Sequence, residues 1–64
     1  TRNILLEDMP RYREVMLPGA RLILSGFYEE DIPLLRARGE ELGLTFVGSE
    51  VRQRWSRVEL LLPA

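Results

Sequence analysis

The fold is decided by residues 19–33, which read GARLILSGFYEEDIP. Three consecutive aliphatic residues, Leu22-Ile23-Leu24, stand between Gly19 and Gly26 without a polar residue among them. An uninterrupted apolar run bounded by glycines is typical of a strand that is covered on both faces, as in a parallel sheet. We therefore expect a central strand over residues 20–25.

This strand is predicted to lead through a loop at residues 26–28 into a helix. The acidic residues 29–31 stabilise a helix N-terminus, and Pro33 is tolerated in a first turn. The helix is expected to continue to Leu42, where its apolar face ends. Gly39 on that face weakens the helix by about 1 kcal/mol relative to Ala, unless a close neighbour needs the space. The predicted core face consists of Ile32, Leu35, Gly39 and Leu42.

Another helix is predicted near the N-terminus, because apolar residues recur there at spacings of four, three and four. Pro10 would break a helix interior but is accepted in a first turn, so the helix should begin near Asp8, its cap, after a turn over residues 3–7. Leu17-Pro18-Gly19 should end it, since the residue before a proline avoids the helical region. The predicted core face consists of Leu5, Met9, Tyr12 and Met16.

Two more strands are expected after the second helix, at residues 44–49 and 55–62. The polar stretch 50–54 separates them, which indicates an antiparallel hairpin. The last strand alternates between an apolar and a mixed face, and Trp55 at its start is interpreted as core packing, with an interface role as the alternative. The elements therefore follow the order helix, strand, helix, strand, strand within one domain, residues 1–64.

Composition excludes several classes of function. The chain has 64 residues with no Cys and no His, so a zinc site, a thiol nucleophile, a Ser-His-Asp triad and a His general base are ruled out. A chain of this size buries only about 60% of the surface its unfolded form exposes, so its core is small. The apolar runs are too short to span a membrane, which predicts a protein without a membrane partner.

Charge gives little indication of a polyanionic partner, because the formal net charge is −1. Arg52, Arg54 and Arg57 are interpreted as solvated strand-edge charges rather than a nucleic-acid patch. The acidic residues 29–31 need no metal ion, since helix N-terminal charge explains them. The opening Thr1-Arg2-Asn3 resembles an internal cut and shows no signal peptide, so a cytoplasmic location is expected.

Several segments together resemble the C-terminal part of ribosomal protein L11 methyltransferases, which are class I S-adenosylmethionine-dependent enzymes. The segments are RNILLEDMP at 2–10, LPG at 17–19 and LSGFYEEDIPLL at 24–35, followed by Gly43-Leu44 and Trp55 where the family has its closing hairpin. The likeness is to the Bacteroidetes-type variant and covers nearly the whole chain. Leu-Pro-Gly is common among methyltransferases, whereas SGFYEEDIP is much more specific.

The resemblance implies an α/β fold, the C-terminal part of a Rossmann-like class I methyltransferase sheet. This chain would supply its last three strands and last two helices, with the third strand here between the first and second and antiparallel to both, and with both helices on one face. The resemblance also implies an intact enzyme that uses S-adenosylmethionine to methylate Lys and N-terminal amines of ribosomal protein L11.

The cofactor is expected to bind elsewhere in such an enzyme, because the family's Gly-rich loop and its ribose-binding acidic residue belong to earlier strands. The chain's own glycines never form a Gly-x-Gly pattern, so it should bind no cofactor and be inactive alone. Methyl transfer from a sulfonium depends mainly on alignment of the nucleophile, so no catalytic residue is assigned here.

Three residues are candidates for substrate binding. Asn3-Ile4 resembles the family's Asn-Ile motif, which orients the substrate amine, although that variant has a second Asn-Ile slightly upstream; the alternative for Asn3 is a helix cap or turn. Phe27 and Tyr28 follow the carboxyl end of the first strand, where open α/β sheets place ligands. The alternative for Phe27 is packing under the second helix.

Two other functions are kept open. The chain can be a freestanding interaction module derived from a methyltransferase, with a bare apolar sheet face and an open strand edge that favour self-association. It can also belong to a methyltransferase of another substrate, since fold does not determine the substrate.

Overall fold

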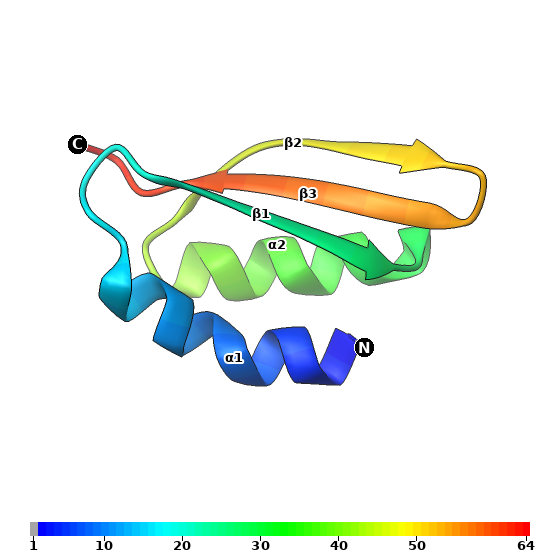
Figure 1. The fold of residues 1–64 in the computed structure, drawn as a ribbon, viewed down its shortest axis with the longest axis horizontal. Coiled ribbons are helices and arrows are strands. Elements are labelled where there is room, and N and C mark those ends of the chain that lie inside the picture. The colour runs from blue at the N-terminus through cyan, green and yellow to red at the C-terminus, as the bar shows by residue number, and fades with distance from the viewer. Residues whose placement is uncertain (1) are drawn as a thin grey trace.

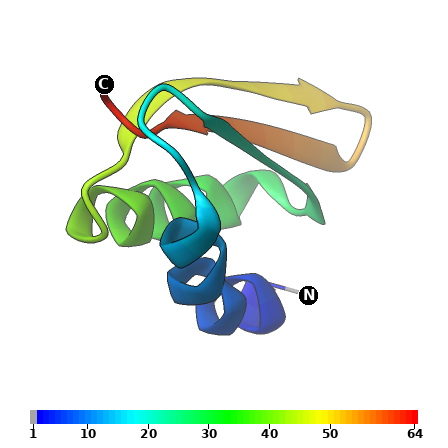
Figure 2. The same ribbon diagram turned by 60° about the vertical axis from the view of Figure 1, so that its left-hand side comes forward.

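The computed structural model describes residues 2–64, and its two helices cover one face of a three-stranded sheet (Figure 1). Figure 2 shows from a second direction that both helices lie on the same side. The predicted order and kind of elements are confirmed. The elements are α1 (Arg2–Val15), β1 (Arg21–Phe27), the short 3-10 helix η1 (Glu29–Asp31), α2 (Ile32–Glu41), β2 (Thr45–Arg52) and β3 (Trp55–Leu61).

The sheet has the strand order β1-β3-β2, with β3 antiparallel to both neighbours. This is the arrangement that the resemblance implies. The prediction that the first strand is central is wrong for the described residues, since β1 is an edge strand of this sheet. Its apolar run does not have both faces covered either: Leu24 is buried, whereas Ile23 on the opposite face is 55% exposed.

β1 is longer than predicted, because a β-bulge keeps two residues of the expected loop in the strand. The pairing of β1 with β3 shifts between Ser25 and Phe27, and Gly26 between them has a φ of 85°. A glycine adopts this conformation without steric cost, so the strand continues through the bulge. The extra residue returns Phe27 to the helix-covered face, where it is buried.

α1 also differs from the prediction, since it starts at Arg2 and contains Pro10 in its interior. Pro10 has no N–H to donate to the preceding turn, which costs helix stability. Burial offsets that cost: Met9 is fully buried, and Leu5 packs against the core. Asp8 is therefore an interior residue rather than a cap, and the predicted turn over residues 3–7 is helical.

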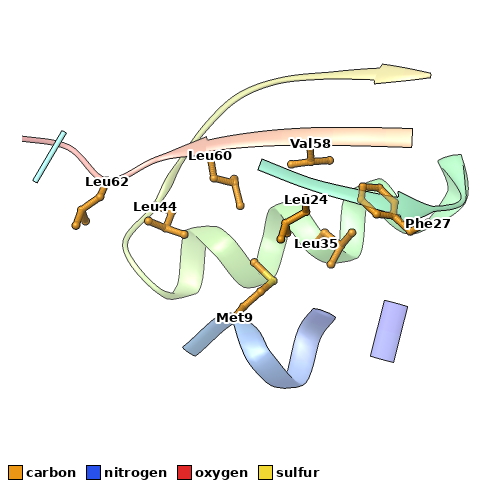
Figure 3. Packing of buried hydrophobic residues seen from close by; sticks show 8 residues of the cluster. All are labelled: Met9, Leu24, Phe27, Leu35, Leu44, Val58, Leu60 and Leu62. Carbon is orange, nitrogen blue, oxygen red and sulfur yellow. The ribbon is translucent and has the colours of Figure 1, made fainter. Parts of the chain in front are cut away.

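The core lies between the sheet and the two helices and contains eight buried apolar side chains (Figure 3). Gly39 of α2 allows a close approach to the sheet: a Cβ atom built there would lie 2.9 Å from Leu60 Cδ1 of β3. The close neighbour that the sequence required for Gly39 is thus present. The core residues are Met9, Leu24, Phe27, Leu35, Leu44, Val58, Leu60 and Leu62.

The β2–β3 hairpin is confirmed, but β2 continues to Arg52 through most of the stretch predicted to separate the strands. Residues 50–52 pair with β3 although two of them are charged, and only the turn at Gln53-Arg54 lies outside both strands. Gln53 there has a φ of 56°, in the left-handed region that tight hairpin turns require.

The sheet face opposite the helices is mixed rather than uniformly apolar as predicted, because ion pairs lie there beside exposed apolar side chains such as Ile23. Ion pairs cross all three strands: Arg21–Glu59 at 2.6 Å, Arg57–Glu59 at 3.9 Å and Arg57–Glu50 at 3.6 Å. Successive strand residues point to opposite faces, so the buried positions of β3 alternate with these charged ones. Neither helix in residues 2–64 is long and apolar enough to cross a membrane.

Candidate functional site

A hollow of about 310 Å³ lies where the N-terminal end of α1, the end of β1, η1 and the start of β3 meet. All three candidate residues, Asn3, Phe27 and Tyr28, line it, although α1 and β1 are separated in the sequence. The structure thus brings them together, while their role in substrate binding stays a prediction. The full lining is Arg2, Asn3, Gly26, Phe27, Tyr28, Glu30, Asp31 and Trp55.

Phe27 forms the floor of the hollow rather than a free rim. Its ring is only 1% exposed and points from β1 into the core, as Figure 3 shows. This agrees with the alternative considered for it, packing under the second helix. The bulge at Gly26 is the local cause, because it turns the side chain inward.

Tyr28 and Trp55 form an exposed aromatic pair at the edge of the hollow. Their ring centroids are 6.2 Å apart and their planes differ by 8°, an offset-stacked arrangement. Tyr28 is 56% exposed and Trp55 is 58% exposed, so the prediction that Trp55 packs in the core is wrong. Trp55 pairs with Arg52 beside the hairpin turn. Exposed aromatic faces contact alkyl chains and cations favourably.

Asp31 was noticed in the sequence only as helix N-terminal charge, yet it is the buried polar centre of this site, at 6% exposure. Its Oδ1 pairs with Arg2 Nη1 at 3.3 Å, and its Oδ2 accepts a hydrogen bond from the Tyr28 backbone N–H at 3.3 Å. The Asp31 N–H donates in return to the Tyr28 carbonyl at 2.9 Å. Arg2 and Asp31 are separated by 29 positions in the sequence, so no local sequence signal indicated this contact.

Asn3 is the second residue of α1, and its exposed side chain faces this network. Arg2 Nε donates to Asn3 Oδ1 at 3.4 Å, so the same guanidinium contacts both Asn3 and Asp31. The amide keeps further hydrogen-bonding capacity, because an Asn side chain has two acceptor sites and two donors. The hollow therefore offers an amide and two aromatic faces, which suit the orientation of a polar or cationic group.

The hollow lacks the glycine-rich cradle expected for S-adenosylmethionine. Of its two carboxylates, Glu30 is exposed, whereas Asp31 is buried and already contacts Arg2 and Tyr28. A cradle for such a cofactor needs neighbouring glycine amides, and Gly26 is the single glycine of the hollow. Residues 2–64 also contain no group of three side chains that could hold a metal ion.

A smaller hollow of about 210 Å³ lies along the strands and shares Trp55 with the first. Ser25, Glu50, Arg52, Ser56 and Arg57 complete its lining. Arg57 forms ion pairs with two glutamates, so its charge is locally compensated. This agrees with the interpretation of the arginines as solvated strand charges.

Comparison with known proteins places these features in context. No protein-family model matches the chain. A protein named ribosomal protein L11 methyltransferase from Bacteroides fragilis is 49% identical over 61 residues, 95% of the chain and 22% of that relative. Proteins of the same name are 43% identical in Phocaeicola vulgatus and, over 86% of the chain, 51% identical in Porphyromonas gingivalis. The resemblance to ribosomal protein L11 methyltransferases is confirmed.

The chain spans about a fifth of the length of these methyltransferases. The similarity to the Bacteroides fragilis methyltransferase covers 95% of the chain, so it is not confined to the hollow. It includes the greater part of both helices and of the sheet that position the hollow. An L11 methyltransferase of this type therefore contains a segment closely similar to the fold described here.

Proposed function

We propose that this chain is part of an S-adenosylmethionine-dependent methyltransferase that modifies ribosomal protein L11. The observation that carries the proposal is the 49% identity, over 95% of the chain, to a protein named for this activity. The strand order β1-β3-β2 with both helices on one face supports a place at one end of a Rossmann-like methyltransferase sheet. The relatives' additional length leaves room for the remaining strands.

The cofactor in this proposal binds to other parts of the enzyme, because the hollow contains a single glycine and so lacks a glycine-rich cradle for it. The chain alone is then inactive. Its contribution is to orient the acceptor amine of a Lys side chain or an N-terminus. The Asn3 side-chain oxygen accepts a hydrogen bond from the amine, and the faces of Tyr28 and Trp55 contact the alkyl part of the acceptor. Such alignment supplies much of the rate enhancement in reactions of already activated groups.

The test is a chimeric enzyme, the Bacteroides fragilis relative with its matching segment replaced by this chain. We expect the chimera to bind S-adenosylmethionine in a calorimetric titration and to methylate L11, while the 64-residue chain alone binds nothing. A folded chimera without L11 methylation would contradict the proposed function. Saturable cofactor binding by the chain alone would contradict the assignment of the cofactor site to other parts.

A freestanding self-associating module is the second candidate, favoured by the edge of β1 that has no partner strand within residues 2–64. Exposed strand edges pair with other chains. The outer face carries ion pairs beside its exposed apolar side chains, whereas the β1 edge offers backbone groups for strand pairing, so the edge is the contact that this candidate favours. Sedimentation of the chain at tens of micromolar decides: a stable monomer excludes this candidate. Methylation of another protein but not L11 would retain the enzyme class and change the substrate.

A further inference from the structure

Two parts of the chain that are far apart in the sequence, and are not paired as strands, form the hollow. Asn3 comes from the first turn of α1, and Tyr28 from the loop between β1 and η1. Both are exposed, and neither is held by the apolar core. Packing of α1 and β1 on the core brings the two residues near each other, and polar contacts across the hollow then fix their relative position.

Asp31 supplies those contacts in both directions. One carboxylate oxygen holds the Arg2 guanidinium at 3.3 Å, and Arg2 contacts Asn3 through a different nitrogen at 3.4 Å. The other carboxylate oxygen holds the backbone N–H of Tyr28 at 3.3 Å. A single buried side chain thus links both walls of the hollow.

Burial of the Asp31 carboxylate makes its contacts with Arg2 and Tyr28 necessary. A carboxylate at 6% exposure needs partners, because an unpaired buried charge is strongly disfavoured. The Arg2 side chain is 42% exposed, so its guanidinium can turn into water if the ion pair with Asp31 is broken. The Asp31 carboxylate would stay buried. Loss of the link would then free Asn3 from its position near Tyr28, while the core of α1 at Met9 stays packed.

We propose that Asp31 is a positioning residue, which holds Asn3 and Tyr28 at a fixed separation so that the acceptor amine meets both; this inference rests on the proposed function. Asp31 does not contact the acceptor in this scheme. It acts through Arg2 on one wall and through the backbone of Tyr28 on the other. A misplaced orienting group disturbs the reacting geometry more than it lowers the affinity for a large protein substrate. Loss of the Asp31 contacts should therefore lower the kcat of L11 methylation and change its KM little.

The experiment uses the chimera described above with Asp31→Asn. This near-isosteric change keeps an acceptor for the Tyr28 N–H but removes the charge that holds Arg2. We expect kcat for L11 methylation to fall about tenfold, with KM changed less than about twofold. Glu29→Gln is the matched control: it makes the same carboxylate-to-amide change two residues earlier, at an exposed position outside the hollow, and should leave kcat unchanged.

A second variant separates positioning from folding. Arg2→Gln removes the other half of the pair at a half-exposed site that contributes little to folding. We expect it to lower kcat as well, and the double variant Arg2→Gln with Asp31→Asn to lose no more than the stronger single variant, because both break one link. Multiplied losses would show that the residues act separately and would overturn the inference.

Magnetic resonance of the 64-residue chain tests the link without any enzyme activity. Asp31→Asn should shift the side-chain amide signals of Asn3 as well as the backbone amide of Tyr28, whereas Glu29→Gln should shift only its neighbours. An Asn3 signal unaffected by Asp31→Asn would overturn the inference. A chimera that keeps its normal kcat after Asp31→Asn would also overturn the inference, but it would leave the proposed function standing. A folded chimera without the substitution that is inactive would overturn the proposed function itself.

Discussion

Replacement of Gly39 by Ala changes a close contact between α2 and the sheet. In a helix interior Ala is favoured over Gly by about 1 kcal/mol, so propensity alone predicts stabilisation. The added methyl group, however, would lie 2.9 Å from Leu60 Cδ1 and 3.0 Å from Leu60 Cδ2. Carbon atoms prefer separations of roughly 3.5–4.0 Å, so Leu60 or the helix must move by about 0.6 Å.

Leu60 has little freedom to move, because it is fully buried. Overpacking of a core costs about 1–3 kcal/mol, and the flexible end of a Leu side chain places this case near the middle of that range, about 2 kcal/mol. Subtraction of the propensity gain of about 1 kcal/mol leaves a net loss of about 1 kcal/mol in the free energy of unfolding. We therefore expect Gly39→Ala to be destabilising.

The sign should reverse when the obstructing atoms are shortened. Leu60→Val withdraws the terminal methyl groups and costs about 1 kcal/mol by itself. In that background the Ala methyl group fills the vacated space, so Gly39→Ala should stabilise by about 1 kcal/mol, the propensity term. The coupling between the two positions is then about 2 kcal/mol, which lies within the range seen for residues in contact.

Urea unfolding followed by circular dichroism measures these four proteins. For a domain of this size, 1 kcal/mol corresponds to a change in Tm of about 4–8 °C, so thermal melting gives a second reading. Ala37→Gly, at an exposed position of α2, is the control that isolates the propensity term, with an expected loss of about 1 kcal/mol. Equal stabilisation by Gly39→Ala in both backgrounds would refute the close packing of α2 on β3.

Three further substitutions test other features. The Ser56 hydroxyl is buried with no hydrogen-bond partner in residues 2–64, so Ser56→Ala should stabilise by about 1 kcal/mol in urea unfolding; a loss of stability would reveal a partner for the hydroxyl. Met9 is fully buried, so Met9→Ala should destabilise by about 2–5 kcal/mol and leave this small domain largely unfolded by circular dichroism, whereas a native spectrum would show that α1 docks without it. Tyr28→Ala should uncover Trp55 and increase acrylamide quenching of its fluorescence; unchanged quenching would mean that the two rings do not stack in solution.

Local patterns predicted much of the fold. Residues 32, 35, 39 and 42 recur at helical spacing, and α2 indeed directs this row toward the sheet, with Leu35 and Gly39 buried. The alternation in β3 likewise predicted which side chains enter the core, since side-chain direction in a strand has a period of two. The strand order came from the resemblance and not from periodicity, because pairing between strands leaves no local signal.

Predictions failed where a distant contact outweighs a local preference. Pro10 indicated a helix start, but burial of Met9 and Leu5 on the α1 face extends the helix through it. Gly26 indicated a loop, but pairing of β1 with β3 turns it into a bulge that buries Phe27. Trp55 indicated a core position from its size, whereas its place beside the hairpin turn leaves it exposed and stacked on Tyr28.

The sequence by itself determined the kinds of elements, their order and the family resemblance, because periodicity, glycines and prolines act over a few neighbouring residues. It also identified Asn3, Phe27 and Tyr28 as candidates. Only the tertiary structure decided that these three line one hollow and that Asp31 bridges its walls. The reason is physical: burial and pairing of a carboxylate depend on what the folded chain places around it, and here the partner Arg2 lies 29 positions away.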